Sequence, residues 1–594
     1  MTEPAFRPLP TYLKRYIVSQ NQDRYTPVDQ AVWRYILRQL KSYLSVHAHE
    51  AYLDGLEKTG ITTEEIPLIQ DISEKLARFG WRALPVSGFI PPAAFMEMQS
   101  LGVLPIASDM RTLEHLLYTP APDIVHEAAG HAPLLANQEY SDYLKQYAQV
   151  AKKALISKED LDVYKAIRDL SDIKEHPAST PEMIRLAEKR LAAANAAVSH
   201  VSEASLLSRM NWWTAEYGLI GDLKSPKIIG AGLLSSVGES ELCLSDKVKK
   251  IPLSLECINY SYDITEPQPQ LFVAKSFSHL REVLEQMAAT MAYRTGGKEA
   301  VEKAVLSETV NTVELDTGLQ IGGVCKSQIV TQEGQVAYLS FEGPTQLAYK
   351  NQQIPGQGTE QHLHGFGTPI GLPRGLQKTR LSMKDFAPLI KNNHVHLIYP
   401  SGVEVRGEYL SHVEHDGVLV VLSLKNATAT LQGSLLFDPA WGTYDMAIGA
   451  TVASVYAGPP DRTAYGETDN FKVEQVPPKP LSELEKTRFQ NYQIVRTLRQ
   501  TVKNIGQLGK TEITAELDRL KKVTQNHRQV FPQDWLLFLE AYEICSFLKR
   551  QTDLDLVPQL TQDLSQILKE LAQNSKTQKL IQDGLKEVHK HILL

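Results

Sequence analysis

The chain has 594 residues, of which 43% are hydrophobic and 22% are charged, and its formal net charge is −7. This composition is typical of globular proteins that fold in water, and at about 100–200 residues per domain the length predicts several domains. The slightly acidic balance gives no electrostatic basis for binding nucleic acid.

Cysteine usage and the first residues of the chain indicate a reducing compartment. The four cysteines are far apart and form no CxxC pair, which disfavours a disulfide framework or a cysteine zinc site. The opening MTEPAFRPLP lacks the basic stretch and apolar run of a signal peptide. The longest apolar runs, such as VLVVL at 418–422, are too short to span a bilayer. We therefore expect a cytoplasmic protein that does not bind membranes.

Residues 1–305 are predicted to form a mainly helical domain. The segments 28–47 and 66–82 place apolar residues at helical spacing. Further helices rich in Ala, Lys and Glu follow, and Thr180 before Pro181 and Glu182 is typical of a helix start. The helices of about 151–205 are interpreted as an insertion, either inert at the surface or able to cover the site or form a subunit contact.

The sequence pattern changes from helix-favouring to strand-favouring after this domain. Residues 306–475 contain short β-favouring runs broken by Gly, Asp and Asn, which predicts a β-rich domain with hairpins. Within it, HLHGFGTPIG (362–371) favours a structural loop over a second metal site. The proline-rich VPPKPLSE (476–483) is typical of a linker. Residues 481–594 are again helical and amphipathic, so their role is either homo-oligomer formation or docking on the first domain.

The stretch PDIVHEAAGHAPLL (122–135) places two histidines and a glutamate, all possible metal ligands, close together. A zinc protease needs histidines four residues apart, whereas His126 and His131 are five apart. On an ideal α-helix this spacing separates them by about 140°, so both can reach one ion only if the helix ends or distorts. Because Gly130 and Pro133 favour a helix end, we predict that His126 lies inside the helix and His131 just beyond it.

Two further stretches add to this motif. In SRMNWWTAEYGLIGD (208–222), Glu216 is a single carboxylate among aromatic residues, where burial is costly unless it is paired or binds a cation. Two histidines and one carboxylate form the facial triad of non-haem Fe(II) oxygenases. The Gly- and Ser-rich KIIGAGLLSSVGES (227–240) is typical of a close-packed turn that can support a ligand histidine.

Together these stretches resemble the pterin-dependent aromatic amino acid hydroxylases. The family motifs stand here, in order, as PDIVHEAAGHAPL, WWTAEYG, GAGLLSSVGE and EPQPQLFVAKSF, and the resemblance covers about residues 86–294. It implies a mainly α catalytic domain of this hydroxylase type, followed by the β-rich and helical regions on which it says nothing. It further implies a monooxygenase, closest to phenylalanine 4-monooxygenase, that uses O2, Fe(II) and a tetrahydropterin, with a free aromatic amino acid as substrate.

The resemblance also assigns the metal and cofactor residues. His126, His131 and Glu216 match the iron ligands of the family. Glu127 matches an acidic residue near the pterin that takes part in catalysis, and Phe95 matches the aromatic residue that stacks on the pterin ring.

The substrate residues are assigned in the same way. Arg111 matches the arginine that pairs with the substrate carboxylate, and Pro122 and Trp212 match residues that shape the aromatic pocket. Ser235 matches a catalytic-site serine at the substrate end that supports an iron ligand. Val273 stands where phenylalanine hydroxylases usually have valine. The resemblance thus implies conversion of phenylalanine to tyrosine.

Two alternatives to phenylalanine hydroxylation remain open from the sequence. The same iron core could act on tryptophan or another aromatic substrate, or the chain could be a non-catalytic scaffold. Asn211 stands where animal enzymes have an aromatic residue, which puts substrate choice in doubt. A counterpart of the family's regulatory domain is not evident before the catalytic region, which puts allosteric activation by phenylalanine in doubt.

Overall fold

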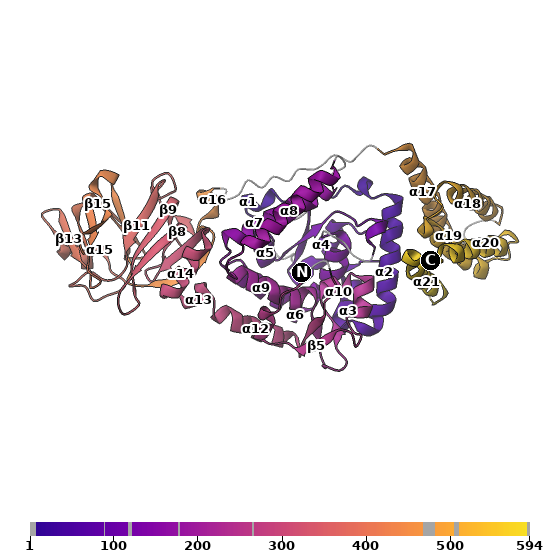
Figure 1. Cartoon of the computed structure of the whole chain (residues 1–594), viewed down its shortest axis with the longest axis horizontal. Helices are drawn as coiled ribbons and strands as arrows, with labels where there is room; N and C mark the ends of the chain where they lie inside the picture. Colours follow the sequence, from indigo (N-terminus) through magenta and orange to yellow (C-terminus); the bar gives the residue numbers. More distant parts are fainter. Residues whose placement is uncertain are drawn as a thin grey trace.

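The computed structural model describes residues 8–87, 90–116, 122–175, 179–263, 266–466, 481–503 and 510–590. Three parts follow one another along its long axis, with the N-terminal part in the middle (Figure 1). The β-rich part and the C-terminal helices lie at opposite ends, although they are neighbours in the sequence. The structure has many helices, several sheets and a C-terminal helical region, as the sequence predicts, and the limits of the domains stay a prediction. Within the described residues, no helix is long and apolar enough to cross a membrane.

The N-terminal part is organised around α2 (Pro27–His47). A capping box starts this helix, because the Thr26 side chain accepts from the Asp29 N–H and the Asp29 carboxylate accepts from the Thr26 N–H. Pro27, in the first turn, has its φ already fixed near the helical value. Apolar residues of α2, including Trp33 and Ile36, are completely buried. The helix therefore anchors the core.

Most other elements of this part are short helices, and most of these pack into the same core, whereas the buried residues of α1 and α5 form a separate cluster. They are α1 (Thr11–Lys14), η1 (Gln22–Arg24), α3 (Glu50–Thr59), α4 (Ile69–Leu76), η2 (Ala77–Phe79), α5 (Pro92–Ser100), η3 (Leu113–His115), η4 (Val125–His131), η5 (Pro133–Ala136), α6 (Gln138–Ala151), α9 (Glu203–Asn211), η6 (Trp212–Glu216), α10 (Ala231–Leu234), α11 (Val237–Leu242), η7 (Leu255–Asn259) and α12 (Phe277–Ala289).

Two small sheets complete the N-terminal part. The strands β1 (Arg82–Val86) and β2 (Val103–Ala107) pair in parallel, with α5 as the crossover between them. A four-stranded sheet has the order β4-β3-β6-β5. Its strands are β3 (Leu219–Ile220), β4 (Lys227–Ile228), β5 (Lys249–Pro252) and β6 (Gln270–Ala274).

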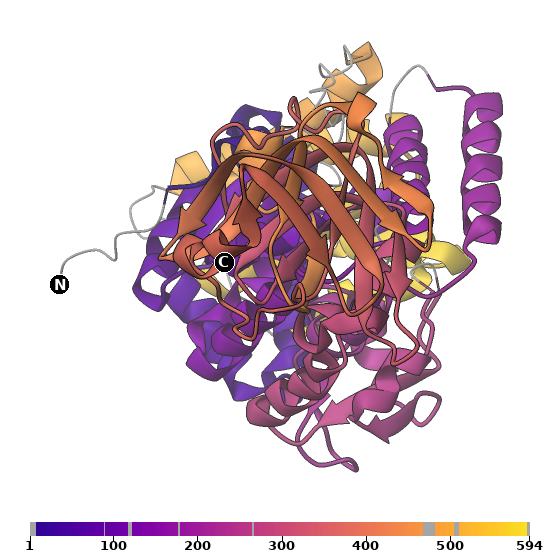
Figure 2. The same ribbon diagram turned by 90° about the vertical axis from the view of Figure 1, so that its left-hand side faces the viewer.

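The expected insertion contains a pair of helices that pack on each other. They are α7 (Lys158–Glu175) and α8 (Pro181–Ala197), and α8 begins where the sequence predicts, with the Thr180 side chain accepting from Met183 N–H. The side chains of α8 are mostly exposed, and the pair stands at the edge of the molecule (Figure 2). An inert surface role and a subunit contact are both compatible with this position.

The β-rich part consists of two six-stranded sheets. One has the order β10-β9-β8-β7-β18 with β11 beside β9, and the other β12-β13-β14-β15-β16 with β17 beside β15. The strands are β7 (Val310–Leu315), β8 (Leu319–Val330), β9 (Val336–Tyr349), β10 (Gln352–Gln353), β11 (Gly365–Pro369), β12 (Ile390–Lys391), β13 (His394–Ile398), β14 (Val403–His415), β15 (Val418–Leu431), β16 (Ser434–Phe437), β17 (Tyr444–Ala447) and β18 (Val452–Ala457). The short helices α15 (Met383–Phe386), η8 (Ala387–Leu389) and η9 (Pro439–Trp441) lie between strands, and α16 (Arg462–Tyr465) follows the last strand.

Two features of this part bear on the sequence predictions. His362 is buried, and its Nε2 lies 2.7 Å from Gln357 Oε1 while its ring meets Phe366 edge-on, as expected of a structural loop. The helices α13 (Ala292–Thr295) and α14 (Gly297–Ser307) pack against β18, and α14 also against β8. The packing unit of the sheets therefore begins before the predicted boundary at residue 305.

The C-terminal helices dock on the outer face of α2. They are α17 (Glu483–Lys503), α18 (Lys510–Val530), α19 (Trp535–Gln551), α20 (Leu556–Leu571) and α21 (Ser575–Lys590), while most of the predicted linker lies outside the described residues. Arg34 of α2 forms a buried ion pair with Glu540 of α19, with Nη2 2.6 Å from Oε2. Tyr35 donates to the carbonyl of Leu580 at 2.8 Å. Of the two predicted roles, docking is present within the chain, and homo-oligomer formation stays a prediction.

Candidate metal centre

Two π-helical turns carry the predicted ligands. The segments η4 and η6 are wound with i→i+5 hydrogen bonds, such as Ala132 N–H to Glu127 O at 3.2 Å and Tyr217 N–H to Trp212 O at 2.8 Å. The prediction that the helix ends between His126 and His131 is therefore wrong. The helix continues through both residues, and its wider turn matches the five-residue spacing and turns both side chains to one side.

The three predicted ligands converge. One ligand atom from each of His126, His131 and Glu216 lies within 4.8 Å of the others. His126 Nε2 is 3.3 Å from Glu216 Oε2, and His131 Nε2 is 3.3 Å from Glu216 Oε1. Two imidazoles and one carboxylate suit a first-row transition metal such as Fe(II) and leave coordination positions open. The donor set therefore fits the expected ion.

The position of Ser235 determines which nitrogen of His126 faces the cluster. The Ser235 hydroxyl donates to the carbonyl of Ala231 at 2.7 Å, and it lies 3.2 Å from His126 Nδ1. A hydroxyl has one hydrogen, so Ser235 must accept from Nδ1–H. This hydrogen bond from Nδ1–H to Ser235 fixes the tautomer of His126, so the Nε2 lone pair is free to bind a metal.

Glu216 is held as a carboxylate at the centre of the cluster. Burial alone would raise its pKa, but the charge on His131 and the adjacent imidazole of His126 hold the pKa well below its usual range. Asn211 adds a hydrogen bond from Nδ2 to Oε1 at 3.3 Å. Glu216 is therefore available as an anionic ligand, and Asn211 orients it.

An aromatic stack lies beside Glu216. Trp212 is stacked with Tyr217 and with Tyr262, at ring-centroid distances of 4.5 and 4.3 Å. The Tyr217 hydroxyl donates to Glu239 at 2.8 Å, so the stack is fixed by a polar contact as well. The buried Trp212 Nε1 has no hydrogen-bond partner among the described residues.

Glu127 points into a buried, strongly polar environment. Burial raises its pKa to about 8, opposed by the charge on His131 and reinforced by the nearby carboxylates of Glu216 and Asp123. Its Oε2 has no hydrogen-bond partner within the described part of the chain. In the metal-free site near neutral pH, the raised pKa favours the protonated carboxyl of Glu127, which can donate as well as accept a hydrogen bond.

Arg111 is connected to the ligand histidine through two buried contacts. Its guanidinium forms a two-pronged ion pair with Asp123, with Nε to Oδ2 at 2.6 Å and Nη2 to Oδ1 at 2.8 Å. Nη1 donates to the Ser235 carbonyl at 3.2 Å. Asp123 Oδ1 also accepts from the His126 N–H at 3.0 Å. Arg111, Asp123, Ser235 and His126 therefore form one network.

Glycines let the elements of this site approach closely. A Cβ on Gly230 would lie 2.4 Å from the Glu216 carbonyl oxygen, and one on Gly130 would lie 2.7 Å from the Ala231 carbonyl oxygen. Both separations are shorter than van der Waals contact. The absence of a side chain at these positions is what brings α10 against both π-helices.

The other predicted site residues lie farther from this network. Pro122 is half-buried and directly precedes Asp123. Val273 is buried in β6, where it pairs with Leu219 of β3. Phe95 packs against a separate hydrophobic cluster that includes residues 9–16 and the ends of β1 and β2. The described contacts thus join Arg111 and Ser235 to His126. Glu127 lies close enough to His131 and Glu216 for their charges to affect its pKa, and Trp212 shares η6 with Glu216. No described contact joins Phe95 or Val273 to the ligands.

Three residues at the site were missed by the sequence reasoning. Asp123 stands in the PDI motif, where a carboxylate three residues before His126 could have been expected to hold a backbone N–H. Asn211, five residues before Glu216, contacts it only because the helix is π-wound. Tyr262 reaches Trp212 from a distant loop, and no local signal predicts that contact.

The raised pKa of Glu127 predicts a pH-dependent effect on stability. The folded pKa is about 8 and the ordinary value is 4.5, so between these values the folded chain holds a proton that the unfolded chain releases. The metal-free wild type should therefore lose about 1.4 kcal/mol of unfolding free energy per pH unit across this window, relative to Glu127→Gln. Urea unfolding of both proteins at pH 5 and pH 8 measures the difference.

The matched control for this experiment is Glu299→Gln at an exposed position. A difference between wild type and Glu127→Gln that stays the same from pH 5 to pH 8 would show that Glu127 is ionised in the folded chain.

Comparison with known proteins gives a consistent family match. Residues 16–162 and 188–310 match the model of the family described as biopterin-dependent aromatic amino acid hydroxylase. The chain is 28% identical over 274 residues to phenylalanine-4-hydroxylase of Mesorhizobium japonicum, covering 46% of this chain and 83% of that protein. It is 30% identical over 275 residues to phenylalanine-4-hydroxylase of Rattus norvegicus, covering 45% of this chain and 50% of that protein.

A solved structure is also similar to this chain. Phenylalanine hydroxylase of Chromobacterium violaceum, with bound iron(III) and 7,8-dihydrobiopterin, is 27% identical with a TM-score of 0.37, covering 47% of this chain and 88% of that one. The residues between the two segments of the family match, 163–187, include most of α7 and the start of α8.

Proposed function

We propose that this chain hydroxylates the ring of a free aromatic amino acid. The match of residues 16–162 and 188–310 to the family of biopterin-dependent aromatic amino acid hydroxylases supports this proposal. The substrate we propose is phenylalanine, and the product tyrosine. The observation that carries this proposal is the convergence of two imidazoles and one carboxylate within 4.8 Å on two π-helices. Such a set holds a redox metal while leaving coordination positions open.

His126, His131 and Glu216 would hold Fe(II) in this proposal. Fe(II) and a tetrahydropterin supply the activation of dioxygen and the two electrons that the reaction needs. The residues of this chain hold the metal, bind the amino acid and keep its ring in place. Ser235 fixes the tautomer of His126, and Asn211 orients Glu216, so the ligands are arranged before the metal binds.

Arg111 is suited to the substrate carboxylate. A guanidinium has five N–H donors, and Arg111 uses three of them on Asp123 and the Ser235 carbonyl. About two donors therefore remain for a carboxylate, with their direction already fixed by the Asp123 pair. The Trp212 stack and Pro122 would hold the aromatic ring, and Val273 supports the choice of phenylalanine.

The pterin is assigned to Glu127 and Phe95. A protonated Glu127 can donate to an acceptor nitrogen or oxygen of a pterin, which an ionised carboxylate cannot do. Phe95 is half-buried on α5, so part of its ring is available for stacking.

Replacing Arg111 should weaken substrate binding more than it slows the reaction. Arg111→Met alone leaves Asp123 buried and unpaired, which by itself destabilises the fold. The double variant Arg111→Met with Asp123→Asn removes both charges together. We expect KM for phenylalanine to rise about 100-fold, since a charged hydrogen-bonded pair contributes about 1.5–3 kcal/mol, with kcat falling much less.

Steady-state kinetics, with circular dichroism as a check on folding, measures this effect. A KM within about threefold of wild type in the folded double variant would remove Arg111 from the substrate site.

A turnover assay tests the function itself. The full-length chain, loaded with Fe(II), is given O2, a tetrahydropterin and one of phenylalanine, tyrosine or tryptophan, and products are identified by mass. Formation of tyrosine from phenylalanine would support the proposal. Hydroxylation of tryptophan alone would mean that the same iron core acts on a different substrate. Absence of product from all three amino acids, with iron bound, would favour a non-catalytic role.

A further inference from the structure

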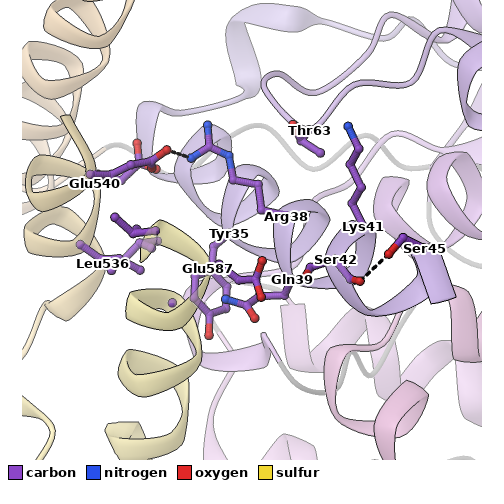
Figure 3. A pocket seen from close by; sticks show the side chains of 14 residues that line it. Tyr35, Arg38, Gln39, Lys41, Ser42, Ser45, Thr63, Leu536, Glu540 and Glu587 are labelled. Carbon is purple, nitrogen blue, oxygen red and sulfur yellow. Dashed lines mark hydrogen bonds and ion pairs between the residues drawn. The ribbon is translucent and has the colours of Figure 1, made fainter. Parts of the chain in front are cut away.

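A cavity of about 170 Å³ lies between α2 and the C-terminal helices, away from the metal centre. Figure 3 shows side chains of α2 on one side of it and Leu536, Glu540 and Glu587 of α19 and α21 on the other. The cavity therefore exists only while the C-terminal helices are docked on α2.

The floor of the cavity is apolar. It is formed by Tyr35, Leu536, Leu539 and Val588, and Gly584 of α21, which has no side chain, leaves space beside them. A Cβ on Gly584 would lie 2.5 Å from Leu539 Cδ2 and 3.2 Å from Tyr35 Cε2. An apolar cavity of about 150 Å³ holds a molecule the size of benzene. The space therefore suits a single ring or a branched aliphatic group.

One wall of the cavity is an ion network whose charged groups are already paired with one another. Arg38 pairs with Glu543 and, at 2.7 Å, with Glu64, while Arg499 pairs with Glu540 at 3.3 Å and with Glu543 at 2.9 Å. Arg34 pairs with Glu540, and Lys503 pairs with Glu64 at 3.1 Å. Because Arg38, Glu540 and Glu543 of the lining have partners within this network, none of them needs a ligand to balance its charge.

Two charged groups of opposite sign remain on the lining. Lys41 of α2 is exposed and forms no ion pair with any described residue. Glu587 of α21 is only 12% exposed and has Lys590 as its ion-pair partner, at a long 3.6 Å. A ligand with a single charge would satisfy one of these groups, whereas a ligand with both charges would satisfy both.

We propose that this cavity binds a small zwitterion with an apolar side group, of the kind of an aliphatic or aromatic amino acid. Its apolar group occupies the floor, its carboxylate faces Lys41 and its ammonium faces Glu587. The ligand contacts both α2 and the C-terminal helices. By linkage, it stabilises their docked arrangement, because it binds only that arrangement.

L-leucine is the probe that tests this site, because it lacks the ring that the proposed metal centre acts on. Titration calorimetry of the full-length chain should give one binding event. Isopentylamine and 4-methylpentanoate keep the aliphatic body and lack one charge each. Isopentylamine lacks the carboxylate that faces the exposed Lys41, so we expect it to bind about two- to fivefold more weakly. The compound 4-methylpentanoate lacks the ammonium that faces Glu587, which is only 12% exposed, so we expect it to bind at least about tenfold more weakly. Hydrogen exchange should slow in α2, α19 and α21 when leucine binds.

Two variants separate the cavity from the rest of the chain. Ser42→Trp fills the cavity and should abolish leucine binding, while Val46→Trp, at a 62% exposed position outside the lining, should leave it unchanged. Lys41→Gln keeps the cavity and the fold, and should weaken leucine binding about two- to fivefold without affecting isopentylamine. No binding by the wild type, isopentylamine binding as tight as leucine, or unchanged binding in Ser42→Trp would each overturn the proposal.

Discussion

We expect replacement of His131 by alanine to remove the proposed iron binding and ring hydroxylation together. His131 is only 3% exposed and contributes one of the three ligand atoms, so its loss leaves two ligands and a gap that alanine cannot fill. A bound metal contributes several kcal/mol to a reaction of this type, so we expect activity to fall about a thousandfold or more. Iron content after desalting and the rate of tyrosine formation are measured on the same sample.

Two control variants make this result specific. Ser235→Ala keeps all three ligands but frees the tautomer of His126, so we expect iron affinity to fall about 10- to 100-fold. His364→Ala changes an exposed histidine of the β-rich part and should alter neither quantity. Full iron content with normal turnover in His131→Ala would contradict the ligand assignment.

The three converging residues could be predicted from the sequence and the family resemblance, but the local structure that presents them could not. Spacing alone showed that His126 and His131 could not share a face of an α-helix. It did not show which distortion resolves this, because helix termination at Gly130 and π-winding satisfy the same constraint. The structure shows π-winding at both ligand segments, where Gly130 and Gly230 serve close packing with α10.

The limits of sequence reasoning follow from where the contacts come from. Helices and strands have local periodicities, so the order of helical, β-rich and helical regions could be predicted. The contact between Arg34 and Glu540 joins residues 506 positions apart, and no local pattern encodes it. The Trp212–Tyr262 stack and the placement of α14 on the sheets are non-local in the same way.

Replacing Glu540 by alanine should release the C-terminal helices from α2. Arg34 and Arg499 have side chains only 3% and 2% exposed, and both pair with Glu540. Without it, Arg34 loses its carboxylate partner inside the interface, and breaking a buried pair in this way costs about 3–5 kcal/mol. Backbone hydrogen exchange in α19 should therefore accelerate by a factor on the order of 100 to 1,000.

Two further variants show whether the buried charge is the cause. Lys579→Ala breaks an exposed pair with Glu241 across the same interface, where the side chains are 63% and 49% exposed, so we expect a change of at most about 1 kcal/mol. Arg34→Met with Glu540→Leu removes both charges while Arg499 keeps Glu543, and should restore slow exchange in α19. Fast exchange in the double variant would mean that docking needs the ion pair itself and not only the absence of an unpaired charge. Unchanged exchange in Glu540→Ala would mean that apolar contacts such as Tyr35 against Trp535 suffice to hold the helices.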